Sequence, residues 1–450
     1  MKLSRREAIA GLGGGLAAGC ATKPAADDSA APEVGTIDTI IIVMMENRSF
    51  DHMFGSMSLL EGRAIDGLVS GMSNPDRDGV AQPIAHADVQ CLPDPHHGWS
   101  SSHDQFNGGA NDGFVRDYGD AEVMHYMTRD DLPVSYALAD AYAVCDRYFC
   151  SVMGPTWPNR FYGHAGSSGG MQGNDWPTDG AFTLPTVWNH LWDAGVPWRY
   201  YYTDIPFIGL FADHYTSDTV GYLEDFIGDA ENGRLPPVVW LDPGFTFNDD
   251  HPPHFVGLGQ EFIAAVYKAI SSGPHWKRCL VLLTYDEHGG FFDHVPPPTT
   301  EDDDAATGFD QLGFRVPVIA FGPWVKAGVC STQFDHASWI KLVCDTYDIE
   351  PWTKRIAAAV SLGEILDADR MAKNDPLPVI ELPAYDYDDD TLPDACFGGG
   401  LGPPAPNGGG GAAPQSTEVW HDLMRRMYPN EDRSQRAKQT SRWIRRYLAT

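Results

Sequence analysis

The stretch Thr36–His52, TIDTIIIVMMENRSFDH, decides the fold. Its apolar run Ile40–Met45 is rich in β-branched residues and too short for a buried helix, so it predicts a strand covered on both faces, as in a parallel sheet. Glu46 and Asn47 follow the run directly. Because functional groups of open α/β sheets lie just beyond the carboxyl ends of strands, a candidate site is expected here. A plain polar turn at the edge of the sheet would give the same pattern.

A second stretch repeats this format. Arg278–His294, RCLVLLTYDEHGGFFDH, contains the short apolar run Cys279–Leu283 and then Asp286 and Glu287. Two buried strands that deliver carboxylates at the same edge of a sheet can form a site for a hard cation. The shared format therefore predicts one joint site made from both stretches.

Helical and strand patterns alternate along the chain and predict an α/β fold with a mostly parallel sheet between helix layers. The order of the strands does not follow from the patterns. Residues 53–132 show little periodicity, and an irregular region of this length inside a domain is usually functional. The expected helices are Pro133–Arg147, Leu184–Ala194, Gln260–Ser271 and Ala337–Tyr347, and the expected strands are Trp198–Tyr202, Val238–Leu241, Arg278–Tyr285 and Val316–Phe321.

Length and charge restrict the class of protein. The 450 residues suit one large α/β domain, which we expect at residues 36–395. The formal net charge of −31 repels nucleic acid, so no nucleic-acid partner is expected. After the N-terminal segment, no run of 18 or more apolar residues suggests a membrane-spanning helix. The eight cysteines contain no CxxC pair, which argues against a zinc–thiolate site and leaves their pairing open.

Residues 1–35 have the pattern of an export signal and tether. Arg5-Arg6 form the arginine pair of a twin-arginine signal, and the short apolar segment Ala8–Gly19 follows. The sequence AAGC at 17–20 resembles a lipoprotein cleavage box, with Ala17 where such boxes usually have leucine. We expect export to the periplasm or cell surface, with membrane contact through a lipid anchor on Cys20. A plain secretory peptide with an incidental cysteine is the alternative.

The C-terminal part is expected to consist of a linker and a basic segment. Residues 396–416, CFGGGLGPPAPNGGGGAAPQS, have the composition of a flexible linker. Residues 417–450 form a basic segment whose last part has a helical pattern. This helix is expected to dock onto the acidic domain, and contact with anionic lipid is the alternative.

Three motifs carry a resemblance to a known family. MMENRSFDHMFG at 44–55, GPTWPNR at 154–160 and TYDEHGGFFDHV at 284–295 resemble the bacterial phosphoesterase family of phosphatidylcholine-preferring phospholipases C and related acid phosphatases. That family is a branch of the alkaline-phosphatase-like superfamily. The resemblance spans roughly residues 36–350, and it implies a three-layer α/β/α sandwich that hydrolyses phosphate esters.

The resemblance also implies roles for the motif residues. Glu46, Asn47, Asp286 and Glu287 would bind one divalent metal ion. Thr156, in a loop that its prolines make stiff, would be the nucleophile and form a phospho-threonine intermediate. The all-oxygen ligand set favours calcium, magnesium or manganese, although zinc is common in the superfamily.

Histidines in the loops are expected to serve the phosphate. The resemblance implies that a histidine of the 96–109 segment belongs to the active site, and we favour His103 over His97. His251 would act with His103 in catalysis by holding phosphate oxygens or protonating the leaving group. His254 and His294 are the expected substrate-binding residues.

Two other interpretations of the loop histidines stay open. Asp250 and His254 have the Asp-x3-His spacing with which the wider superfamily binds a second metal, and His336 could be a third ligand. Alternatively, the histidines only fill the surface.

The predicted function is that of an exported, metal-dependent, phospholipase C-like phosphoesterase. Its substrate would be a phospholipid or a small phosphate ester, and the headgroup and the oligomeric state stay open. The larger phospholipases of the family carry a long β-rich C-terminal extension that this sequence does not show, so an acid-phosphatase-type phosphomonoesterase is the first alternative. A non-catalytic lipoprotein that binds phosphorylated ligands is the second.

Overall fold

Strand β1 (Thr39–Met45) is the centre of the molecule in the computed structural model, and all of its residues are buried. It pairs in parallel with β10 (Cys279–Tyr285) on one side and with β9 (Val238–Asp242) on the other. Met45 lies opposite Tyr285 in this register, so the two acid motifs begin at the same level of the sheet. The prediction of two buried strands that end at one edge is confirmed. The structure describes residues 35–88, 91–176, 182–211, 213, 216–385, 387, 392, 396 and 433–450.

The main sheet has the strand order β12-β6-β11-β10-β1-β9-β7-β8. Only β11 runs antiparallel to its neighbours among these strands, so the expected mostly parallel sheet is confirmed. The remaining strands of this sheet are β6 (Ala143–Cys145), β7 (Trp198–Tyr202), β8 (Val220–Tyr222), β11 (Ile319–Phe321) and β12 (Gly328–Cys330). Two small sheets, β2 (Ser73–Pro75) with β3 (Ala81–Pro83) and β4 (Ala85–His86) with β5 (His125–Tyr126), lie outside it.

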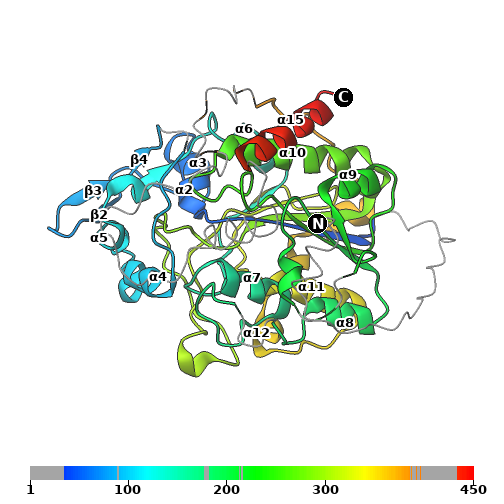
Figure 1. Cartoon of the computed structure of the whole chain (residues 1–450), viewed down its shortest axis with the longest axis horizontal. Helices are drawn as coiled ribbons and strands as arrows, with labels where there is room; N and C mark the ends of the chain where they lie inside the picture. Colours follow the sequence, from blue (N-terminus) through cyan, green and yellow to red (C-terminus); the bar gives the residue numbers. More distant parts are fainter. Residues whose placement is uncertain are drawn as a thin grey trace, which may run out of the picture.

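Helices cover both faces of this sheet, which confirms the three-layer architecture. In Figure 1, α6, α9, α10 and α15 lie above the sheet, and α7, α8, α11 and α12 lie below it. The upper layer consists of α6 (Pro133–Ala141), α9 (Leu223–Glu231), α10 (Val256–Ser272) and α15 (Arg433–Leu448), and the lower layer of α7 (Thr156–Ala165), α8 (Val187–Asp193), α11 (Ala337–Tyr347) and α12 (Lys354–Ala358).

The region after β1 contains more regular structure than its composition predicts. It forms a group of short helices and strands at the left of Figure 1, beyond the carboxyl end of β1. Buried apolar side chains such as Phe114, Tyr118 and Phe314 stabilise this group as a small core of its own. Its helices are α2 (Phe50–Phe54), α3 (Ser56–Leu59), α4 (Trp99–Phe106) and α5 (Phe114–Tyr118).

The expected helix Pro133–Arg147 is wrong in its second half. Helix α6 ends at Ala141, and Tyr142 has extended backbone angles. Ala143–Cys145 form β6, which is fully buried between β11 and β12. Pairing within the sheet overrides the helical spacing of the apolar residues, because a short buried strand and a buried helical turn have similar patterns.

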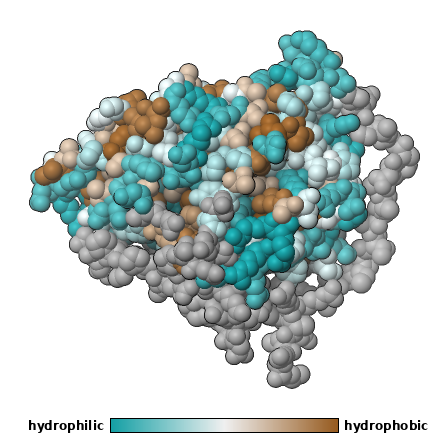
Figure 2. All heavy atoms as spheres, turned by 90° about the horizontal axis from the view of Figure 1, so that it is seen from above, coloured by the Kyte–Doolittle hydropathy of each residue, from teal (hydrophilic) through white to brown (hydrophobic). Residues whose placement is uncertain are grey.

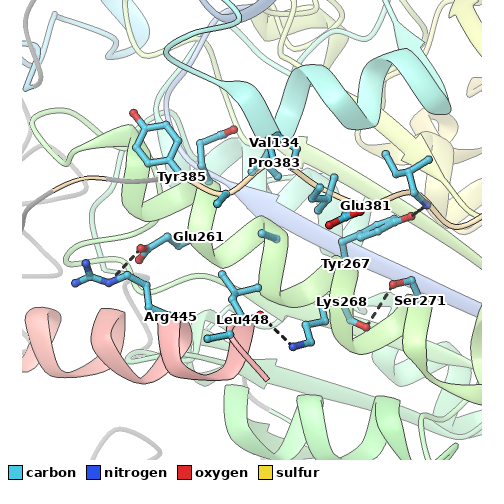
Figure 3. A pocket seen from close by; sticks show the side chains of 16 residues that line it. Val134, Glu261, Tyr267, Lys268, Ser271, Glu381, Pro383, Tyr385, Arg445 and Leu448 are labelled. Carbon is cyan, nitrogen blue, oxygen red and sulfur yellow. Dashed lines mark hydrogen bonds and ion pairs between the residues drawn. The ribbon is translucent and has the colours of Figure 1, made fainter.

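The basic C-terminal helix α15 lies against α10, as its charge predicts (Figures 1 and 3). Arg445 is ion-paired with the buried Glu261, at 3.3 Å between Nε and Oε1. Lys268 Nζ donates a hydrogen bond of 2.7 Å to the Tyr447 carbonyl. The predicted export signal at 1–34 and nearly all of the predicted linker lie outside the described residues.

The surface carries several exposed apolar side chains, including Leu60, Val69 and Val80. Figure 2 shows hydrophobic residues in separate patches among hydrophilic ones on the upper face. In the part of the chain that the structure describes, no helix combines the length and the apolar character needed to span a bilayer.

Candidate active site

The turn after β1 brings the two strand-end motifs together. Asn47 has a positive φ of 59°, a left-handed conformation that asparagine adopts more readily than most residues. Its backbone N–H donates a 2.9 Å hydrogen bond to Asp286 Oδ1. Glu46, Asn47, Asp286 and Glu287 are all fully buried. The predicted joint site is therefore a contact between neighbouring strand ends.

Thr156 lies beside this turn. Its hydroxyl Oγ1 donates a 3.3 Å hydrogen bond to Asn47 Oδ1, and its side chain is fully buried. The expected stiff loop is wrong at this position, because Thr156 is the first residue of α7, with Pro155 as the N-cap. The fixed φ of proline suits a helix start, so the proline-rich sequence positions a helix N-terminus here. The positive end of the helix dipole therefore faces the acids and any anion bound beside them.

Several carboxylate oxygens of the site are buried without a hydrogen-bond partner among the described residues. They are both oxygens of Glu46, Asp286 Oδ2 and Glu287 Oε1. Burial raises the pKa of Asp286 to about 6, and burial together with the Asp286 charge raises the pKa of Glu46 and Glu287. Unpaired buried carboxylates are costly, and a hard cation satisfies such oxygens, so these residues fit a bound divalent metal ion.

Arg160 supplies part of the missing positive charge, and the sequence analysis did not identify it. Its Nε lies 3.4 Å from Glu46 Oε1 and 3.4 Å from Asp286 Oδ2, and its NH1 is ion-paired with Asp242 at 2.9 Å. One guanidinium faces at least these three carboxylates, so the cluster stays negative. Arg160 follows Thr156 by four residues, which places both on one face of a helix. That spacing inside GPTWPNR was the available signal.

His97, and not His103, contacts the strand-end residues. His97 Nε2 lies 3.0 Å from Asn47 Nδ2 and 3.6 Å from Glu287 Oε1, while its Nδ1 donates to the Pro95 carbonyl at 2.8 Å. The Asn47 amide can therefore donate to Nε2, which leaves its oxygen toward Thr156. Burial lowers the pKa of His97 to about 4, so the ring is neutral at pH 7.

His103 lies one helical turn into α4. Its Nδ1 is 2.7 Å from the Trp99 carbonyl, and its ring packs on Trp99 with centroids 4.8 Å apart. Both of these contacts lie within its own helix. The preference for His103 over His97 is corrected, because His97 contacts Asn47 whereas His103 contacts Trp99 of its own helix.

His251 and His254 lie close to His97, whereas the sequence analysis grouped His251 with His103. The rings of His97 and His251 have centroids 5.7 Å apart, and those of His251 and His254 are 6.3 Å apart. Nδ1 of His251 lies 2.6 Å from the Pro252 carbonyl, and Nδ1 of His254 lies 2.6 Å from Asp249 Oδ1. Since these oxygens can only accept, each Nδ1 carries the hydrogen and Nε2 lies on the other side of the ring.

The structure gives His294 a different environment from the expected substrate contact. Its Nδ1 lies 2.6 Å from Asp51 Oδ2 and its Nε2 lies 3.1 Å from Asp66 Oδ1. Arg315 pairs with Asp51 and with the neighbouring Asp293, at 3.0 and 2.9 Å. Asp51, Asp293 and His294 could also hold a cation by their spacing, but Arg315 already supplies that charge. Both ring nitrogens of His294 are engaged in this ion-pair cluster, so we correct its role to a structural one.

The second-metal alternative also needs correction. Asp250 Oδ2 accepts a 2.5 Å hydrogen bond from the Tyr285 hydroxyl, and His336 Nε2 lies 2.6 Å from the Asp286 carbonyl. His254 is held by Asp249, the residue before Asp250. The Asp-x3-His spacing therefore does not form a ligand set with His336. Among the described residues near the strand ends, a different set could hold a metal ion. Asp94, His97 and His251 each offer one ligand atom, and these atoms all lie within 4.8 Å of one another.

The chain is similar to several known proteins. Residues 37–350 match the Phosphoesterase family. The chain is 33% identical over 400 residues to non-specific phospholipase C1 of Arabidopsis thaliana, covering 77% of this chain and 75% of that one. It is 32% identical over 383 residues to phospholipase C B of Mycobacterium tuberculosis, covering 68% and 72%. Among solved structures, phosphonate monoester hydrolase of Agrobacterium radiobacter is 9% identical with a TM-score of 0.38, covering 73% of this chain and 77% of that one. The family match and the two phospholipase C relatives show that this chain belongs to the Phosphoesterase family and is a hydrolase acting on phosphate esters.

Proposed function

We propose that the protein is an exported, metal-dependent phosphodiesterase that cleaves the headgroup from a phospholipid, as a phospholipase C does. The observation that carries this proposal is the Thr156 hydroxyl, which is buried and bound to Asn47 beside carboxylates with several oxygens that accept no hydrogen bond from the described residues. The names of the relatives support the lipid substrate.

Glu46, Asn47, Asp286 and Glu287 would hold one divalent cation. Such a cation, when bound, supplies positive charge that lowers the pKa of a neighbouring hydroxyl and offsets charge on the phosphate. The hard oxygen donors favour calcium, magnesium or manganese, and zinc remains compatible with them.

Thr156 would attack the phosphorus atom and displace the alcohol of the diacylglycerol. The bond from Oγ1 to phosphorus forms as the bond to the leaving oxygen breaks, which leaves the phosphorylated headgroup on Thr156. Water later hydrolyses this phospho-threonine ester and releases the phosphorylated headgroup. The N-terminus of α7 faces the transferred phosphoryl group, and Arg160 balances part of the charge of the acids behind it. A neutral His97 holds the Asn47 amide, so that Asn47 Oδ1 faces the nucleophile.

His251 and His254 would serve the phosphate oxygens and the leaving group. Burial lowers the pKa of His251 well below its usual value, so this ring is neutral in the metal-free protein. A phosphate bound beside His251 raises the pKa of this ring through its negative charge, and a protonated Nε2 can then donate to an oxygen. The Asp249 carboxylate holds Nδ1 of His254 and fixes the orientation of that ring.

A substrate panel tests the proposed function. Purified protein with added metal should release phosphocholine and diacylglycerol from phosphatidylcholine micelles, and much less inorganic phosphate from phosphomonoesters. Release of inorganic phosphate alone would support the acid-phosphatase alternative. No turnover of any ester with any metal, while inorganic phosphate still binds, would support the non-catalytic alternative.

His97→Ala should lower kcat/KM by about 10- to 100-fold, because the Asn47 amide loses the group that orients it. His103→Ala is the matched control, since His103 also lies in this segment but contacts Trp99. We expect the control to keep near-normal kcat/KM. Steady-state kinetics on a soluble phosphodiester would measure both, and a larger loss in the His103 variant would contradict the site described above.

Export and lipid anchoring belong to the same proposal. The disulfide Cys91–Cys396 supports an oxidising compartment, because disulfides are rare in the cytosol. Replacing Arg5-Arg6 with two lysines should keep the precursor in the cytoplasm, and Cys20→Ser should give protein that is exported but not membrane-bound. Cell fractionation measures this, and a Cys20→Ser protein that still sediments with membranes would exclude the lipid anchor.

A further inference from the structure

The histidines of the site lie on two connecting segments, and both segments are linked to the disulfide Cys91–Cys396. His97 lies six residues after Cys91, before α4 begins, and the loop between β9 and α10 carries His251 and His254. Cys91 is bonded to Cys396. The backbone carbonyl of Cys396 accepts a 3.2 Å hydrogen bond from the N–H of Phe255, the residue after His254. The bridge therefore links the His97 segment to Cys396, whose backbone is hydrogen-bonded to the end of the other histidine segment.

The two bridged cysteines belong to, or pack against, one apolar cluster. Phe247 and Phe255, which flank the histidine loop, pack with Cys396 in one buried cluster, and Cys91 lies partly buried against it. The other members come from α10 and from the C-terminal part of the chain: Leu258, Tyr385, Tyr387, Leu392 and Ala437. The cluster therefore brings the C-terminal part of the chain into contact with the residues that flank the histidine loop.

The C-terminal part is itself fixed to the α/β body. Glu261 of α10 is fully enclosed and accepts hydrogen bonds from Ser441 at 2.8 Å and from Tyr387 at 3.0 Å, in addition to its ion pair with Arg445. Figure 3 shows Tyr385 beside this helix and Arg445 directed at Glu261. The disulfide thus ties the His97 segment to a structure that is anchored on α10.

We propose that the Cys91–Cys396 disulfide is a positioning element of the active site, which keeps His97, His251 and His254 arranged for binding the phosphate group of the substrate. This inference rests on the proposed function. The carboxylates proposed to bind the metal ion lie at the ends of β1 and β10, outside the two segments that carry the histidines. Loss of the bridge should therefore weaken phosphate binding while leaving metal bound at saturating metal concentration.

On this proposal, the redox state of Cys91 and Cys396 controls the phosphoesterase activity. In forming the bridge, the two thiols give two electrons and two protons to a disulfide-containing oxidant, which leaves as two thiols. On the proposed twin-arginine route the chain folds in the reducing cytoplasm and meets such an oxidant only outside. The phosphoesterase would become fully active after export.

The test compares the full-length protein with the double variant Cys91→Ser/Cys396→Ser, with and without tris(2-carboxyethyl)phosphine. This phosphine takes the oxygen of one water molecule as it reduces the disulfide, and the two water hydrogens become the thiol protons. Cys330→Ser is the control, since Cys330 is a free cysteine on β12. The readouts are kcat and KM on a soluble phosphodiester, calorimetric binding of inorganic phosphate, metal content, thiol count and circular dichroism.

We expect reduction to raise KM and the Kd for inorganic phosphate by about tenfold or more in the wild type and in Cys330→Ser. The double variant should show these values without reductant and no further change with it, at unchanged metal content and circular dichroism. Unchanged KM and Kd after full reduction, confirmed by thiol count, would overturn the proposal. Parallel loss of metal and secondary structure would also overturn it, by showing a purely structural bridge.

The two claims can fail separately. A wild type that hydrolyses no phosphate ester contradicts the proposed function, and calorimetry with inorganic phosphate still tests the bridge. If the double variant does not fold, reduction of the folded wild type decides the outcome.

Discussion

Thr156→Ala is expected to lower kcat by about 10³-fold or more on a phosphodiester substrate. The variant lacks the only oxygen of this side chain, and in the structure that oxygen is buried and bonded to Asn47 Oδ1 at 3.3 Å. The acids and Arg160 remain, so metal content and fold should be retained. Steady-state kinetics, metal analysis and thermal melting measure these three quantities.

Thr156→Ser is the matched control. It keeps an attacking hydroxyl and removes one methyl group from a fully buried position, so measurable activity and a modest loss of stability are expected. A Thr156→Ala enzyme with near-normal kcat would contradict nucleophilic attack by this residue. A Thr156→Ser enzyme that is as inactive as Thr156→Ala, with an intact fold, would also contradict nucleophilic attack by the hydroxyl at this position.

Asp286→Asn is expected to abolish metal retention and with it nearly all activity. The substitution preserves shape but removes one charge from a cluster in which Glu46, Asp286 and Glu287 offer unpaired oxygens. Hard cations depend on such charge for affinity. Excess chelator should inactivate the wild type in the same way, and metal analysis after dialysis gives the comparison. Full activity in chelator, with no metal in the protein, would contradict the metal site.

Asp293→Asn serves as the control for this variant. Asp293 is equally buried, but its partner is Arg315 at 2.9 Å. Its loss should lower the melting temperature because Arg315 loses a buried partner, while metal content stays unchanged. A control that also loses metal would show that the first result reports general unfolding.

The same cluster predicts a dependence on pH with a definite sign. Burial raises the pKa of Asp286 to about 6 in the metal-free protein. The folded chain therefore binds more protons than the unfolded chain between about pH 4 and pH 6, and the stability of the metal-free protein should fall as pH rises through this range. Protons compete with the cation, so metal affinity should fall as pH drops below about 6.

The central fold and most of the acid site follow from the sequence because short apolar runs of β-branched residues specify buried strands. Ile40–Met45 and Cys279–Leu283 both give this signal, and the acids directly after them share an edge once the strands pair. The actual pairing partner of β1 could not be predicted, because strand order depends on contacts between distant segments. Strand β6 was missed because it, too, depends on pairing with strands that are distant in the sequence, β11 and β12.

The rest of the site depends on where individual helices begin, which the amino-acid composition does not reveal. Thr156 and Arg160 share a face only because GPTWPNR begins a helix, whereas its prolines suggest a stiff loop. The sequence analysis favoured His103 over His97 without a local signal that separates them, and the start of α4 between them decides which one contacts Asn47. The partner of Cys91 could not be deduced, since cysteine pairing carries no local signal.

The most direct test of the proposed mechanism is a search for the phosphorylated headgroup on Thr156, which is phosphocholine when phosphatidylcholine is the substrate. Metal-loaded enzyme is mixed briefly with substrate, quenched in acid, digested and analysed by peptide mass spectrometry. We expect a peptide that contains Thr156 and carries the mass of the phosphorylated headgroup, present only with substrate and metal and absent from Thr156→Ala. Rapid turnover with no such adduct on Thr156 at any quench time, together with an active Thr156→Ala enzyme, would contradict the covalent mechanism.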